Sequence, residues 1–124
     1  MSFSKICIAG AGTMGAGIAQ VTAAAGYDTL LFEVNPTVLG AAQARIEAEV
    51  RRLAEKGKIT AEAGRELLGR IRYTSEVSDC RADLIIEAII EKEEAKTALF
   101  RALAESNGPA TVLASNTSSL SLSA

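Results

Sequence analysis

The hexapeptide GAGTMG, residues 10–15, constrains the fold of this chain most strongly, because it places three glycines directly behind the apolar run KICIA at residues 5–9. Short apolar runs rich in branched residues are typical of buried parallel strands. Glycines at this spacing permit a tight turn from a strand into a helix, and they also let a phosphate-bearing ligand approach the helix N-terminus. The hexapeptide therefore predicts either a nucleotide-binding loop or a plain turn.

Strand and helix patterns alternate along the rest of the chain. Gly26, the Asn35 and Pro36 pair and Thr60 mark helix boundaries. Strands are predicted at residues 5–9, 29–32, 71–74, 84–90 and 111–114, with helical patterns that end near residues 25, 53, 68 and 103. This order predicts an α/β fold with a Rossmann-type doubly wound, mostly parallel sheet, incomplete at its C-terminal side.

An acidic residue follows the second predicted strand, where a dinucleotide-binding unit requires one. Glu33 comes about 20 residues after the glycine loop, within the spacing of the dinucleotide fingerprint. Gly10 would form the tight turn, Gly12 would admit the pyrophosphate, and Gly15 would let the helix pack closely. A carboxylate accepts both ribose hydroxyls and repels a 2′-phosphate, so the pattern favours NAD over NADP. The alternative for Glu33 is a solvated residue at a strand end.

A second group of polar residues follows the later strands, at the same edge of the predicted sheet. Glu87 lies in the second half of the fourth strand and Glu91 follows it, Lys96 lies on the next helix, and the segment SNTSSL occupies residues 115–120. In open α/β sheets a ligand binds beyond the carboxyl ends of the strands, where the strand order reverses. Glu91 and Lys96 are equally compatible with a surface ion pair, and SNTSSL with a helix cap.

Composition excludes several other classes of function. The net charge of −2 and a pI near 5.2 provide no broad positive field, so neither nucleic acid nor an anionic membrane is an expected partner. No apolar run reaches the length of a membrane span and no signal peptide is recognisable, which favours a cytoplasmic location. The sequence has no histidine and no CxxC pair, so we expect no metal site, and Cys7 and Cys80 are expected to be free thiols.

Four segments together resemble a known family. KICIAGAGTMGAGIAQ, LFEVNP, ADLIIEAIIEKEEAKTALF and ASNTSSLS are similar, in this order, to the nucleotide-binding domain of L-3-hydroxyacyl-CoA dehydrogenases, including bacterial 3-hydroxybutyryl-CoA dehydrogenases. The resemblance covers nearly the whole chain. The last two segments are more specific to this family than the glycine motif, which many enzymes share. It implies an oxidoreductase of fatty acid metabolism and β-oxidation that interconverts L-3-hydroxyacyl-CoA and 3-oxoacyl-CoA.

The resemblance also implies residue roles. Glu33 would bind the adenosine ribose, Glu91 and Lys96 the nicotinamide half of NAD, and Ser118 both the cofactor and the substrate oxygen as the catalytic residue. Lys56, at the end of the long helix, would contact the CoA moiety of the acyl-CoA substrate. The pyrophosphate would lie against the loop residues Gly10, Ala11, Gly12, Thr13, Met14 and Gly15.

One departure from the family pattern affects the chemistry. The family removes the hydroxyl proton with a histidine oriented by a glutamate, and both lie beyond SNTSSL, as does a helical domain that closes over substrate and forms the homodimer. We therefore expect residues 1–124 to be the NAD-binding domain alone, which binds NAD without catalysing the reaction. The alternatives are a noncatalytic NAD-binding redox sensor or regulatory module, and a methyltransferase whose glycine loop holds S-adenosylmethionine.

Overall fold

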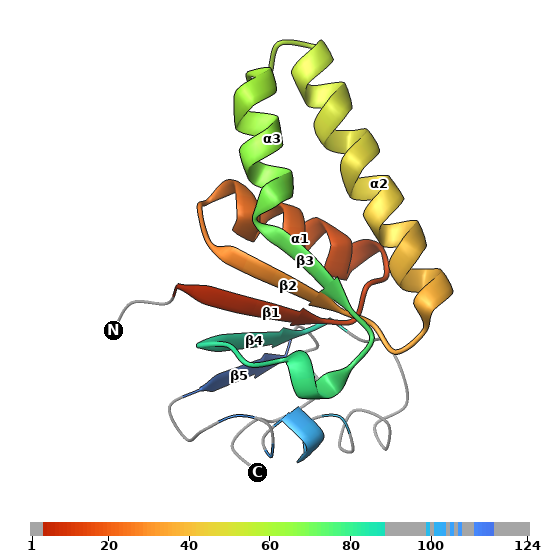
Figure 1. Cartoon of the computed structure of the whole chain (residues 1–124), viewed down its shortest axis with the longest axis vertical. Helices are drawn as coiled ribbons and strands as arrows, with labels where there is room; N and C mark the ends of the chain where they lie inside the picture. The colour runs from red at the N-terminus through yellow and green to blue at the C-terminus, as the bar shows by residue number, and fades with distance from the viewer. Residues whose placement is uncertain are drawn as a thin grey trace.

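A single parallel sheet forms the centre of the computed structural model, which describes residues 4–88, 99, 101–103, 105, 107 and 111–115. Figure 1 shows its five strands in the order β3-β2-β1-β4-β5. The strands are β1 (Lys5–Ala9), β2 (Asp28–Phe32), β3 (Ile71–Thr74), β4 (Leu84–Glu87) and β5 (Val112–Ser115); the helices are α1 (Thr13–Ala24), α2 (Pro36–Glu55), α3 (Ala61–Gly69) and the short 3₁₀ helix η1 (Val77–Asp79).

Strand β1 lies in the middle of this sheet, and the strand order reverses beside it. It pairs in parallel with β2 on one side and with β4 on the other, so that Ala9 stands level with Phe32 and with Glu87. Parallel pairing aligns the carboxyl ends of the three strands, which therefore release their following residues at one edge. This edge is the ligand-binding edge of an open α/β sheet.

Two apolar clusters cover the two faces of the sheet. Successive residues of a strand point to opposite faces, so Ile6 and Ile8 join one cluster while Cys7 and Ala9 join the other. The first cluster packs against α1, α2 and α3, and the second against Leu103 and the segment before β4. Both faces are therefore buried around the central strand, as the near-continuous apolar run in β1 predicts.

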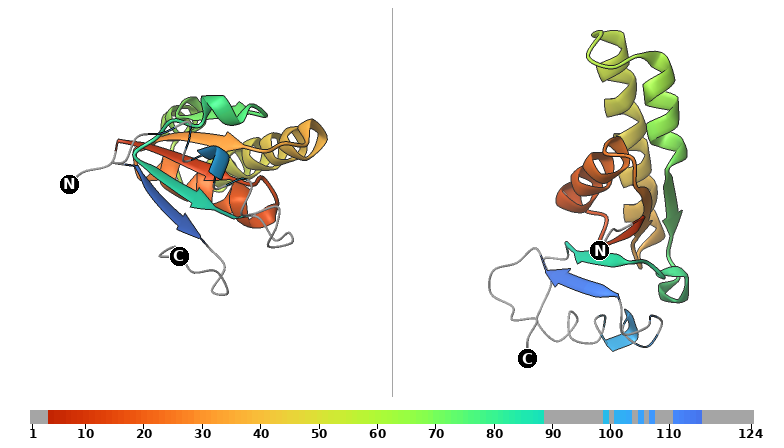
Figure 2. Two further views of the ribbon diagram at one scale, coloured as in Figure 1. Left: turned by 90° about the horizontal axis from the view of Figure 1, so that it is seen from below. Right: turned by 90° about the vertical axis from the view of Figure 1, so that its left-hand side faces the viewer.

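Helices α2 and α3 form a hairpin that extends well beyond the sheet (Figures 1 and 2). The Asn35 side chain accepts from two N–H groups of the first turn of α2, and the Thr60 side chain accepts from the Ala63 N–H at 3.0 Å in α3. Gly57 turns the chain between the helices with a φ of 73°. The two helices pack closely, because a Cβ on Gly64 would lie 3.2 Å from Val50 Cγ1.

The sequence predicted the order and direction of these elements, and the doubly wound class is confirmed. The fourth strand is shorter than predicted: it ends at Glu87, and Ala88 already lies outside it. The apolar run continues past Glu87, so hydrophobicity alone could not mark that end. The 3₁₀ helix at Val77–Asp79 was not predicted. Among the described residues, no helix is long and apolar enough to cross a membrane.

Helix α1 sits directly on the turn that precedes it. A Cβ built on Gly15 would lie 1.7 Å from the Gly10 carbonyl oxygen, whereas a Cβ on Gly17, in the same helix, would meet none of the described residues within 4 Å. The two glycines are equivalent in helix propensity, so only their surroundings distinguish them.

We predict that Gly15→Ala destabilises the chain by about 3 kcal/mol or more, because the clash is with backbone that cannot move aside. Gly17→Ala is the matched control in the same helix and should stabilise it by about 0.5–1 kcal/mol. Urea unfolding of both variants checks this. Equal free energies of unfolding for the two variants would contradict the packing described for Gly15.

The Cys7 thiol is fully buried in the second cluster, together with Cys80. Hydrogen bonding with the Cys80 thiol, followed by burial, raises the pKa of Cys7 far above its ordinary value of 9.0. An unfolded chain would ionise this thiol above pH 9, whereas the folded chain would keep it protonated. The folded state then holds more protons than the unfolded state, so this thiol lowers stability as the pH rises.

We expect the contribution of Cys7 to fall by about 1.4 kcal/mol for each pH unit above 9. Urea unfolding at pH 8 and pH 10 of the wild type and of Cys7→Ser measures it, because serine keeps a hydrogen-bonding group that does not titrate in this range. The variant should lose less stability between the two pH values than the wild type does. Parallel losses would show that the thiol ionises equally in both states.

Candidate functional site

The glycine loop follows β1 at the carboxyl edge of the sheet and is fixed on both sides. Gly10 has a φ of 111°, a conformation that favours glycine, and its N–H donates to the Phe32 carbonyl at 2.7 Å. On the other side, the Ala88 N–H donates to the Ala9 carbonyl at 2.8 Å. Bonds to β2 and to the end of β4 therefore hold the start of the loop over the place where the strand order reverses.

No contact among the described residues requires a glycine at position 12. Its φ of −69° and ψ of −170° are open to any residue, and a Cβ there would meet no described atom within 4 Å. Gly10 is explained by its backbone angle and Gly15 by its contact with Gly10. The open space beside Gly12 is where the backbone could be approached by a ligand, and a side chain would occupy that space.

Helix α1 begins at this loop without a cap from the described side chains. Gly12 occupies the N-cap position, and the first turn carries no acidic residue. Helices α2 and α3 both have a side-chain cap, from Asn35 and Thr60. The positive end of the α1 dipole therefore lies at the turn around Gly12, where it favours an anion such as a pyrophosphate.

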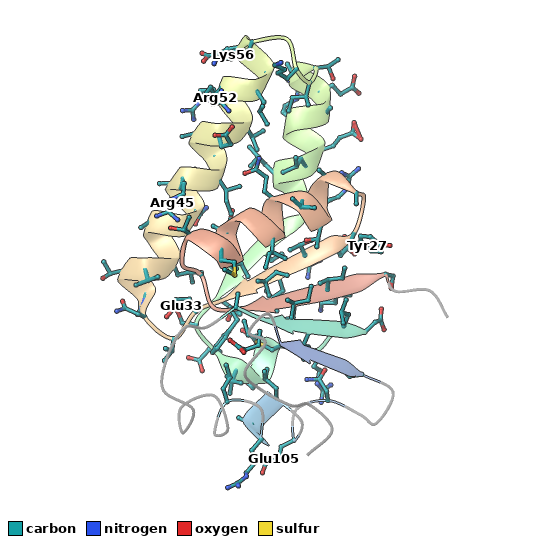
Figure 3. The ribbon with its side chains drawn as sticks, turned by 180° about the vertical axis from the view of Figure 1, so that it is seen from behind. Tyr27, Glu33, Arg45, Arg52, Lys56 and Glu105 are labelled. Carbon is teal, nitrogen blue, oxygen red and sulfur yellow. The ribbon has the colours of Figure 1, made fainter. Side chains whose placement is uncertain are left out.

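Glu33 lies beside the loop, at the end of β2 and at the base of α2 (Figure 3). It is half-buried, and its Oε1 accepts from the Ala11 N–H at 3.0 Å while its Oε2 accepts from the Asn35 N–H at 3.0 Å. Each carboxylate oxygen has a second lone pair, so two further acceptor positions remain for the hydroxyls of a ribose.

The structure brings the loop residues and Glu33 together and places Lys56 elsewhere. Thr13 and Met14 are exposed in the first turn of α1, and Gly10, Ala11 and Gly15 are buried beneath them. Lys56 caps the far end of α2, which at 20 residues is about 30 Å long, so it lies well away from Glu33 (Figure 3). The predicted residues Glu91, Lys96 and Ser118 lie outside the described residues, and their roles stay predictions.

Two residues of this site were not singled out from the sequence. Val34, next to Glu33, is apolar yet 71% exposed. The signal available in the sequence was an apolar residue directly after the predicted ribose-binding carboxylate. Asn35 was predicted only as a helix cap, and its backbone N–H also orients the Glu33 carboxylate.

The sequence profile of a known family matches residues 5–124, and the family is described as the NAD binding domain of 3-hydroxyacyl-CoA dehydrogenase. A probable 3-hydroxybutyryl-CoA dehydrogenase of Bacillus subtilis is 42% identical over 97% of this chain. A 3-hydroxyadipyl-CoA dehydrogenase of Escherichia coli is 41% identical over 100% of the chain. The chain spans 42% of the length of the first relative and 26% of the second.

Solved structures agree with these sequence matches. The crystal structure of 3-hydroxybutyryl-CoA dehydrogenase from Escherichia coli K12 superposes with a TM-score of 0.93 at 39% identity, over 99% of this chain and 26% of that chain. An NAD⁺-dependent dehydrogenase acting on a pyridine carboxylic acid superposes with a TM-score of 0.78 at 30% identity, over 94% of this chain and 38% of that chain. The same nucleotide-binding architecture thus accompanies different substrates.

The open space at Gly12 yields a prediction about cofactor binding. Gly12→Val should lower NADH affinity at least roughly 100-fold, because the side chain fills the path of the pyrophosphate. The free energy of unfolding should change by no more than about 1 kcal/mol, since a Cβ at this position meets no described atom within 4 Å. Fluorescence titration with NADH and urea unfolding measure the two quantities.

Gly69→Val is the matched control for that variant. Gly69 ends α3, and a Cβ there also has no neighbour within 4 Å in the described part of the chain. This variant should keep wild-type NADH affinity. Wild-type affinity in the folded Gly12→Val variant would instead mean that the loop is only a turn.

Proposed function

We propose that this protein interconverts L-3-hydroxyacyl-CoA and 3-oxoacyl-CoA by NAD-dependent hydride transfer, because its chain belongs to the family of NAD-binding domains of 3-hydroxyacyl-CoA dehydrogenases. The observation that carries the proposal is the glycine at position 12, which no contact among the described residues requires, beside a helix N-terminus that no described side chain caps and beside a carboxylate. These three features fit the pyrophosphate and ribose of a dinucleotide.

Different described residues would bind different parts of the cofactor. The backbone from Gly10 to Gly15 would hold the pyrophosphate, Glu33 would accept the adenosine ribose hydroxyls, and Val34 would pack against the adenine attached to that ribose. NAD, when bound, supplies the acceptor for the hydride that leaves carbon 3 of the substrate. The proposed role of this part of the chain is therefore to bind and orient the cofactor.

The remaining assignments rest on the resemblance of motifs. Glu91 and Lys96 would bind the nicotinamide half of NAD, and Ser118 would hydrogen-bond the 3-oxygen of the substrate. Lys56, exposed at the end of the α2 and α3 hairpin, would contact the CoA moiety. A cation suits the phosphates of CoA, and its distance from Glu33 is compatible with a separate binding position for a long substrate.

Proton removal would require a base from outside residues 1–124, since no histidine occurs in this sequence. A serine hydroxyl is too weak a base at neutral pH to take the proton of an alcohol unaided. We accordingly propose that residues 1–124 act as the cofactor domain of a longer cytoplasmic homodimeric enzyme, in which a helical domain carries the catalytic histidine and its glutamate. The names of the relatives support acyl-CoA as the substrate class.

Cofactor preference tests the site. NADH should bind roughly 100-fold more tightly than NADPH, because the 2′-phosphate of NADPH would meet the Glu33 carboxylate. Glu33→Ala should weaken the binding of NADH and reduce the difference in affinity between NADH and NADPH. Parallel fluorescence titrations of the wild type and the variant measure both effects, and equal affinity of the wild type for the two cofactors would overturn the role given to Glu33.

A further inference from the structure

We propose that Glu33 has a second role, as a positioning residue that holds the glycine loop in its binding conformation before any cofactor arrives. This inference deepens the proposed function and rests on it for its purpose, but not for its structural basis. The carboxylate joins two segments that are far apart in sequence, since one oxygen accepts from Ala11 in the glycine loop and the other from Asn35 before α2.

The Ala11 N–H depends on this carboxylate. Ala11 is 1% exposed, and within the described part of the chain its N–H donates to Glu33 Oε1. A buried backbone donor that loses its acceptor is strongly unfavourable. Bonds from N–H groups to an ionised carboxylate are also stronger than bonds between neutral groups. Without Glu33 the loop would have to rearrange or admit water.

Glu33 is itself held firmly enough to position another segment. Its backbone N–H donates to the Thr74 carbonyl of β3 at 3.0 Å. The side chain of Asn35, whose backbone N–H is bound by Glu33, caps α2 through the Thr37 N–H at 2.9 Å. Glu33 thus connects the loop to β3 through its backbone and to the start of α2 through its carboxylate, and regular secondary structure fixes both of those elements.

This arrangement couples recognition of the ribose to the shape of the pyrophosphate site. If the carboxylate only binds ribose, its removal should lower the affinity of every adenosine ligand by the same factor. If it also holds the loop, its removal should lower the affinity more for a ligand whose phosphates reach the loop. AMP and ADP separate the two cases, because they share the ribose and differ by one phosphate.

The first experiment measures backbone amide hydrogen exchange by NMR in the ligand-free chain. Glu33→Ala should raise the exchange rate of the Ala11 amide at least about tenfold, while the Thr37 amide, bonded to Asn35 Oδ1, keeps its rate. Glu55→Ala, which removes an exposed carboxylate at the far end of α2, is the control and should change neither rate. An unchanged Ala11 rate in Glu33→Ala would overturn the proposal.

A second variant guards against a general loss of folding in Glu33→Ala. Glu33→Gln preserves size and one acceptor oxygen but turns an NH₂ group toward the other backbone N–H. Either Ala11 or Asn35 should then exchange faster, while the amides of β1 stay protected. Unchanged rates at both amides would contradict the positioning role.

The second experiment compares affinities for AMP and ADP by NMR titration. Glu33→Gln should lower the affinity for ADP by a factor about tenfold larger than the factor by which it lowers the affinity for AMP. Equal losses for the two ligands would show that Glu33 reads only the ribose. If the wild type bound neither ligand nor NADH, the proposed function would fail, whereas the exchange experiment would still decide whether Glu33 holds the loop.

Discussion

The close contact between Gly15 and the Gly10 carbonyl is the constraint on which the rest of the structure depends. It seats α1 directly on the turn after β1, with no room for even a methyl group between them. Because β1 is the central strand, this contact fixes the helix N-terminus over the point where the strand order reverses. The position of the N-terminal end of α1, where an anion is proposed to bind, therefore follows from backbone packing rather than from side chains.

Electrostatics then complete the site around that helix end. Asn35 and Thr60 cap α2 and α3, whereas α1 begins at Gly12 without a cap from a described side chain. The Glu33 carboxylate bonds to Ala11 at the side of the loop and leaves the turn at Gly12 open. The carboxylate thus lies where the ribose is expected, and the positive end of the helix dipole lies where the phosphates are expected. This arrangement would set the orientation of a bound dinucleotide.

The α2 and α3 hairpin separates two charged residues of the proposed binding sites. Glu33 stands at the base of α2 and Lys56 at its far end, so the charges proposed for cofactor and CoA are held apart by the length of one helix. Gly64 lets the two helices approach closely, and a described side chain caps each of them. A separation of one helix length suits the proposed acyl-CoA substrate, which carries a long nucleotide-containing handle.

The sequence by itself determined the strand and helix order, the parallel sheet and the meeting of the glycine loop with Glu33, because hydrophobic periodicity, caps and glycine spacing are local signals. The sequence pattern placed the end of the strand that begins at Leu84 too late, because apolar residues continue beyond Glu87, the last residue of that strand to pair with β1. Only the tertiary structure distinguished Gly12 from Gly15, placed the Cys7 and Cys80 thiols in one cluster and tied Glu33 to Ala11. Those facts depend on which distant atoms pack against each residue, and no local pattern in the chain encodes that.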